Sequence, residues 1–352
     1  MPDGSGSIQG AVVKLSINDT ELPTDQLAAL TSATVDQRLN LPAACTVVIT
    51  PLDYDSLSAK AMDYGTFGLG GAMTLAMGFG DPVAMFSGKV AALEPTLSAG
   101  KRAMQVTGYD ALFDLDFGSA AKVFYDSTDS QIAEQVITAG GFTPEADPTE
   151  ALYPYVLQNN ISNYRMLLSR AARLNFELSA WQDTVSFRAS RVGDVTVASL
   201  EYGAGLIDFR ARVRALKRGS SVTRRGWDPK AKQVVTGTTS SGAPSDLMGG
   251  EQTGYEASSN FPSSAVTGPN GSITDSQIAT SLAQGVYETG LDDFIEGSGE
   301  CNGTPAITPG ANVEIKGVGD RFDGPYYVTA AVHAYDTRTG YRTRFEVRRT
   351  GI

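Results

Sequence analysis

The chain is long enough for more than one domain, and it is acidic. Its 352 residues exceed the usual domain length of about 150 residues, so we expect about two to three domains. The formal net charge of −11 argues against general binding to nucleic acid or to an anionic membrane. No apolar run reaches the roughly 20 residues of a membrane span, so we predict no membrane anchor.

The first hundred residues carry a series of short strand patterns separated by Gly, Pro and Asp turns. Short β-runs with frequent turns are typical of a barrel or a sandwich. The expected strands cover residues 11–17, 46–50, 73–79, 83–93 and 103–109.

After residue 109 the pattern changes to a small α/β unit. A short strand at 123–125 precedes a helix that begins at a capping box formed by Thr128 and Gln131. A second helix begins at Ser162, and a hairpin follows with Gln182 and Asp183 at its turn.

Two long strands are expected next, over residues 206–216 and 221–235. Alternation in the first of them places Arg210, Arg212 and Arg214 on one face and apolar residues on the other. We predict that this basic face is a subunit or partner interface.

Residues 236–274 are rich in Gly, Ser, Thr and Pro and predict a long loop or strap that orders only against a partner. A capping box from Thr274 to Gln277 then predicts a helix. The chain returns to strands at the end, and these are expected over residues 294–301, 312–316, 326–335 and 341–347.

The charge is unevenly distributed along the chain. Residues 1–150 hold 19 acidic and 7 basic residues, and residues 201–232 hold 3 acidic and 9 basic residues. Residues 233–300 hold 9 acidic residues and no Lys or Arg. This alternation favours surfaces that complement each other, within one chain or between copies, although ordinary solvated faces remain the alternative.

The sequence offers little for catalysis or metal binding. It has one histidine, His333, in a strand pattern, and two distant cysteines, Cys45 and Cys301, which predict buried thiols. Calcium at Asp320 and Asp323 is a minor alternative.

Carboxylate pairs are the remaining candidates for an enzyme, because a glycosidase needs two such groups. The candidate pairs are Asp114 with Asp116 and Asp292 with Asp293. Such pairs are expected by chance in a chain with 39 acidic residues, so we predict no catalytic, cofactor-binding or metal-binding residues.

Three blocks of the sequence together resemble a known family. They are residues 75–117 (LAMGFGDPV…), residues 122–137 with 155–178 (KVFYDSTDSQ…, YVLQNNISNY…), and residues 307–347 (ITPGANVEIK…). In this order they resemble the phage late-control D family, the baseplate central hub proteins of contractile tails and injection systems. That family is related to the N-terminal half of the type VI secretion spike protein.

The resemblance implies a β-rich α+β fold with two similar tube-like β-barrel domains. Residues 1–110 would form the first barrel and residues 111–200 an α/β domain. Residues 201–235 with 300–352 would form the second barrel, and residues 236–299 an insertion with a strap and a helix.

The function implied is that of a structural hub without enzymatic activity. A homotrimer with pseudo-sixfold symmetry would adapt a hexameric inner tube, or a tube-initiator protein, to a separate trimeric spike, next to other baseplate proteins. We expect assembly in a bacterial cytoplasm, a place in the baseplate of a phage tail, tailocin or injection particle, an acidic bore, and no sequence-specific nucleic-acid binding. The alternative is a tail-associated β protein that binds or cleaves glycans.

Overall fold

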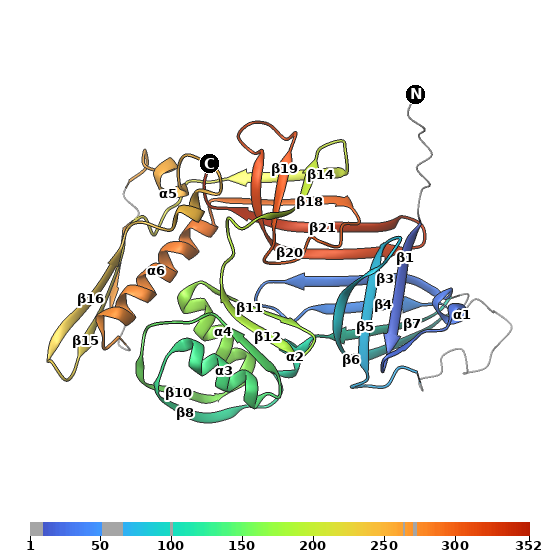
Figure 1. The fold of residues 1–352 in the computed structure, drawn as a ribbon, viewed down its shortest axis with the longest axis horizontal. Coiled ribbons are helices and arrows are strands. Elements are labelled where there is room, and N and C mark those ends of the chain that lie inside the picture. Colours follow the sequence, from blue (N-terminus) through green and yellow to red (C-terminus); the bar gives the residue numbers. More distant parts are fainter. Residues whose placement is uncertain (1–9, 51–65, 99–100, 263–264, 270–272) are drawn as a thin grey trace.

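The computed structural model describes residues 10–50, 66–98, 101–262, 265–269 and 273–352. One large sheet of 13 strands runs through the upper and right-hand parts of the molecule in Figure 1, and the longer helices lie to the lower left. The predicted β-rich α+β class is therefore confirmed. No helix of the described residues is long and apolar enough to cross a membrane.

The first half of the large sheet is built by the N-terminal region. Its strands alternate buried and outward residues, so that Met73, Leu75 and Met77 are fully buried in β5. These side chains lie in the first hydrophobic core. The elements are β1 (Ala11–Ile17), β2 (Thr20–Glu21), α1 (Thr24–Leu27), β3 (Leu30–Arg38), β4 (Ala44–Ile49), β5 (Ala72–Phe79), β6 (Val83–Ser98) and β7 (Lys101–Tyr109).

The second half of the sheet surrounds a second core, which is rich in aromatic residues. Tyr326 and Phe345 are among its buried side chains, and their strands show the same alternation. The elements are β13 (Thr196–Glu201), β14 (Leu206–Val213), β18 (Ile295–Asn302), β19 (Asn312–Lys316), β20 (Gly324–Asp336) and β21 (Gly340–Arg349).

The two halves repeat one strand order. Across the sheet the first half runs β3-β4-β7-β6-β5-β1, and the second runs β14-β18-β21-β20-β19-β13. The order along the chain corresponds as well, since β1, β3, β4, β5, β6 and β7 match β13, β14, β18, β19, β20 and β21 in turn. One difference is that β13 pairs with β19 in parallel, whereas β1 pairs with β5 antiparallel.

The halves are joined edge to edge, because β20 pairs antiparallel with β3. The expected two tube-like β-barrels are not confirmed. The described strands instead form one continuous sheet whose halves each cover a separate core.

A compact α/β module lies below the sheet in Figure 1. The predicted capping box of Thr128 and Gln131 begins α3, and Ser162 caps α4, as expected. Gln182 adopts a positive φ of 52° at the predicted hairpin turn. The elements are α2 (Ala111–Asp114), β8 (Ala120–Ser127), α3 (Asp129–Ala139), β9 (Thr143–Ala146), β10 (Tyr153–Ile161), α4 (Asn163–Leu174), β11 (Phe176–Trp181) and β12 (Thr184–Ala189).

The segment between β14 and β18 forms a three-stranded sheet covered by a long helix. The elements are β15 (Val222–Asp228), β16 (Gln233–Thr239), η2 (Pro244–Leu247), α5 (Gly254–Ala257), β17 (Val266–Pro269) and α6 (Ser276–Asp292). The described part of residues 236–274, predicted to be a long loop or strap, thus contains the end of β16, η2, α5 and β17, with loops between them.

Two further predictions in this segment are corrected. The expected single strand over 221–235 is a hairpin, because the Asp228 side chain accepts hydrogen bonds from the amides of Lys230 and Ala231 and closes a turn. Helix α6 is capped by Asp275, not by Thr274, since the Asp275 carboxylate accepts from the amide of Gln277.

Candidate interaction surface

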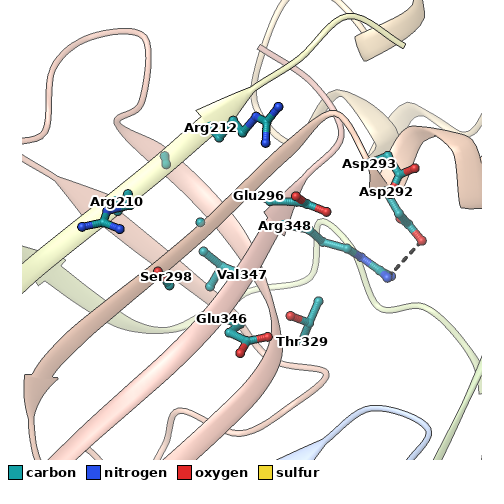
Figure 2. Close-up of a pocket in the computed structure, with 12 residues that line it drawn as sticks. Arg210, Arg212, Asp292, Asp293, Glu296, Ser298, Thr329, Glu346, Val347 and Arg348 are labelled. Carbon is teal, nitrogen blue, oxygen red and sulfur yellow. Dashed lines mark ion pairs between the residues drawn. The ribbon is translucent and has the colours of Figure 1, made fainter. Parts of the chain in front are cut away.

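Two neighbouring grooves lie on the outward face of the second half of the large sheet. The first has a volume of about 590 Å³ and lies between β14, β18, β21 and the end of α6, as Figure 2 shows. The second, of about 380 Å³, continues across β18, β21 and β20 as far as Arg38 of β3. Both grooves share Ser298 and Glu346, so they form one polar surface.

The predicted basic face lies on this surface. Arg210 and Arg212 project from β14 and are exposed, while the alternate residues Phe209 and Ala211 pack on the second core. The strand ends at Val213. The three arginines therefore lie close together, with the third just beyond the end of the strand.

The three arginines differ in their partners. Arg214 binds the carboxylate of Glu296 at 2.6 Å and donates from Nε to the carbonyl oxygen of Asp293 at 2.7 Å. Its partners thus belong to the same chain. Arg210 and Arg212 form no ion pair or hydrogen bond among the described residues.

Ion pairs continue across the polar face, between neighbouring strands and across the intervening β20. Arg344 of β21 binds Glu300 of β18 at 3.0 Å, and Arg38 of β3 binds Glu346 of β21 at 3.2 Å. Sequence reasoning missed these residues. The alternating charges of the strand patterns over 294–301 and 341–347 are the signal that could have revealed them.

A buried joint lies at one end of the first groove. Arg348 binds Asp292 of α6 at 2.9 Å and Glu177 of β11 at 3.3 Å, and Tyr327 donates its hydroxyl to Glu177 at 2.6 Å. Burial raises the pKa of Asp292 to about 6, although Arg348 lowers it. One arginine therefore links the sheet, the α/β module and the insertion helix.

The candidate carboxylate pairs of a glycosidase are engaged in other contacts. Asp114 binds Lys89 at 2.6 Å, and Asp116 accepts a hydrogen bond from Ser162. Asp292 binds Arg348, as described above. Asp293 lies 3.4 Å from Arg214.

The remaining candidates have structural surroundings. His333 is fully buried, and its ring nitrogens lie 2.8 Å from the Tyr341 hydroxyl and 2.8 Å from the Ile307 carbonyl oxygen. The predicted buried thiols are confirmed. The two carboxylate oxygens of Asp323 accept from the amides of Gly317 and Val318, so they close a turn.

A family model matches residues 8–336, nearly the whole chain. The chain belongs to the Alg8 N-terminal domain family. That description names a domain and no reaction. No curated protein matches the sequence.

Several solved structures share the fold of this family member. The 43 kDa tail protein of prophage MuSo2 from Shewanella oneidensis is 16% identical, with a TM-score of 0.71 over 96% of this chain and 98% of that chain. A tail protein from Neisseria meningitidis is 12% identical, with a TM-score of 0.66 over 96% of both chains.

A third neighbour comes from a secretion system. An E. coli protein, described as a component of the type VI secretion system with structural similarity to bacteriophage tail proteins, is 11% identical. It has a TM-score of 0.60 over 95% of this chain and 76% of that chain. The predicted resemblance to the baseplate hub family is therefore confirmed at the level of the fold.

Proposed function

We propose that this chain is a structural hub of a contractile tail, tailocin or injection system. In this role it forms a homotrimer that adapts a hexameric inner tube to a separate trimeric spike. The observation that carries the proposal is the repeat of one strand order in the two halves of the sheet. Three copies with two equivalent halves present six equivalent units, and so meet a sixfold partner on one side and a threefold partner on the other.

The proposed division into domains follows the same logic. Residues 1–110 and residues 201–235 with 300–352 form the two tube-like barrels of the assembled ring, and each half has a core of its own in support. Residues 111–200 form the α/β domain, and residues 236–299 form the insertion.

We place the polar face of the sheet toward the bore of the ring. The opposite face covers the two hydrophobic cores, so it cannot line the bore. The bore is then lined by both signs of charge, among them Arg344, Glu300 and Glu346, in place of the expected acidic lining.

The role needs no catalysis, cofactor or metal. The hub assembles in a bacterial cytoplasm and functions in the baseplate, next to other baseplate proteins, and it neither anchors in a membrane nor reads a nucleic-acid sequence. Support comes from the candidate carboxylates, which are held by basic or hydroxyl groups of the same chain. These contacts give no support to glycan binding or cleavage.

Mass measurement and imaging of the purified chain test the proposal. We expect a particle of three times 37.1 kDa that images as a ring with six similar lobes. The particle should stack between a tube ring and a spike when these proteins are added.

A chain that stays monomeric with and without the tube and spike proteins would contradict the hub. A glycan array and a polysaccharide cleavage assay on the same preparation test the alternative. Binding or cleavage without ring formation would favour it.

A further inference from the structure

Eight strands of the large sheet form a run with an open edge at each end. The run follows the order β14-β18-β21-β20-β3-β4-β7-β6. Among the described residues, 208–213 of β14 pair with β18 alone. In β6, residues 83–89 pair with β5, whereas residues 92–98 pair with β7 alone within the part of the chain that the structure describes. Each copy therefore has two edges that can accept another strand.

We propose that the β14 edge of one copy pairs antiparallel with residues 92–98 of β6 in the next copy, with Arg212 opposite Glu94. This inference rests on the proposed homotrimer and names the surfaces that hold it together. A second copy is the occupant because the two open edges carry opposite unpaired charges on one chain.

The chain contains its own template for this junction, where β20 meets β3. In the repeat, β6 is the counterpart of β20, and β14 is the counterpart of β3. Register shifts in all four strands fix the alignment of the counterparts. The shifts lie at Val90/Ala92 in β6, Val328/Ala330 in β20, Leu30/Ser32 in β3 and Leu206/Asp208 in β14.

Counting from these shifts gives the register between copies. Glu94 takes the place of Val332, two residues beyond the shift in each long strand. Arg212 takes the place of Asp36, four residues beyond Ser32 and Asp208. Val332 lies opposite Asp36 in the β20–β3 ladder, so the same register places Glu94 opposite Arg212.

The charges at these positions fit the pairing. Glu94 and Arg212 are exposed, and neither forms an ion pair among the described residues. Opposite charges that face each other across antiparallel strands stabilise the pairing, and like charges weaken it. The next outward position pairs Arg210 with the uncharged Thr96. Pro95 supplies no N–H, which leaves this ladder one donor short.

The direction of the strands allows a closed ring. Every neighbouring pair in the run is antiparallel, so its eight strands begin and end in opposite directions. The β14 strand of the next copy therefore continues the alternation. A contact between different surfaces of identical chains closes into a ring when the rotation between neighbours divides a full turn evenly, and in the proposed trimer three copies leave no open edge.

Disulfide trapping tests the register. Directly opposed residues of antiparallel strands have Cα atoms about 4.5–5.5 Å apart, which a disulfide can bridge. We expect the double variant Glu94→Cys/Arg212→Cys to oxidise to a covalent trimer. The native Cys45 and Cys301 are buried and should not interfere. The control Glu94→Cys/Arg210→Cys is displaced by two residues and should cross-link about tenfold less.

A charge exchange tests the ion pair separately. Arg212→Glu places two carboxylates opposite each other and should weaken trimer formation by about tenfold. Adding Glu94→Arg restores the opposite charges and should recover most of the loss. Sedimentation at a series of protein concentrations measures both changes.

The outcomes separate this interface from the hub itself. A wild-type trimer whose Glu94→Cys/Arg212→Cys variant cross-links no better than the control overturns the interface and leaves the hub standing. A trimer whose stability does not change with Arg212→Glu also overturns the interface and leaves the hub standing. A covalent trimer from the designed pair supports the interface, even where the wild-type trimer dissociates on dilution. A wild-type chain that forms no trimer with or without the tube and spike proteins, together with a designed variant that does not cross-link, overturns both proposals.

Discussion

The two halves of the large sheet share a backbone plan but differ in the chemistry of their outward face. Strand order and register shifts correspond between them. Across β3, β4 and β7 the outward row is Thr34, Thr46 and Thr107, and its counterpart across β14, β18 and β21 is Arg210, Ser298 and Glu346.

The buried faces of the two halves differ less than their outward faces do. Both cores hold aliphatic and aromatic side chains, but the first also holds methionines such as Met73 and Met77, whereas the second is richer in aromatic residues such as Tyr326 and Phe345. Both sets are apolar and alternate with period two, which is enough to specify a strand with one buried face. The outward positions are therefore free to carry charge in one half and hydroxyl groups in the other.

The largest difference that we expect between the halves concerns Arg348. Its counterpart in the first half is Tyr109, because Arg348 lies opposite Glu296 and Tyr109 lies opposite Ala44, at equivalent positions. Replacing Arg348→Met leaves Asp292 buried without its cation and should lower the free energy of unfolding by about 3–5 kcal/mol. Chemical denaturation measures the change.

Two controls show whether the unpaired charge causes the loss. Tyr109→Phe removes a hydroxyl at the equivalent position and should change the stability by less than about 0.5 kcal/mol. Adding Asp292→Asn to Arg348→Met should recover part of the loss, because one of the two carboxylates that lose Arg348 is then neutral. Equal losses at Arg348 and Tyr109 would show that packing, not charge, separates the halves.

An intermediate effect is expected at His333, the one histidine of the sequence. Burial lowers its pKa from 6.5 to about 4, so folding favours the neutral ring. Its contribution is fully present above pH 6.5 and is lost as the pH falls toward 4. The shift corresponds to about 3 kcal/mol at full protonation.

The comparison with His333→Gln isolates this titration from the carboxylates. Burial raises the pKa of Asp110, in the first half, to about 7, so its neutral form is favoured and acidification stabilises the fold there. Both proteins contain Asp110, so its titration cancels in the comparison. Because only wild type has the buried ring, it should lose stability relative to His333→Gln between pH 6.5 and 4. Parallel pH profiles of the two proteins would show that the ring is not held neutral.

Strong local signals made much of the fold predictable from the sequence. The strand at β1 and the start of α3 were predicted correctly, since apolar alternation and a Thr–Gln capping box act within a few residues. The Arg210 and Arg212 face was predicted for the same reason, because alternation in one strand decides it.

Long-range pairing and weak alternation hid the rest. The β3 strand was missed because its buried positions include the small Ala33, and its outward positions are polar. The junction of β20 with β3 joins residues about 300 positions apart, so no local pattern predicts it. The ion pairs of the polar face depend on that pairing, and they could not be assigned before the register was known.

The smallest effect that we expect comes from exchanging an outward row between the halves. Arg344 and Glu300 form an exposed ion pair across β21 and β18, and their counterparts across β7 and β4 are Gln105 and Val48. The double variant Arg344→Gln/Glu300→Val should change the free energy of unfolding by about 0.2–1 kcal/mol, as is usual for an exposed pair. Denaturation at low and high salt measures it, and salt should weaken only the wild type. A loss several times larger would mean that the charges of the second half, and not its buried face, specify that half of the sheet.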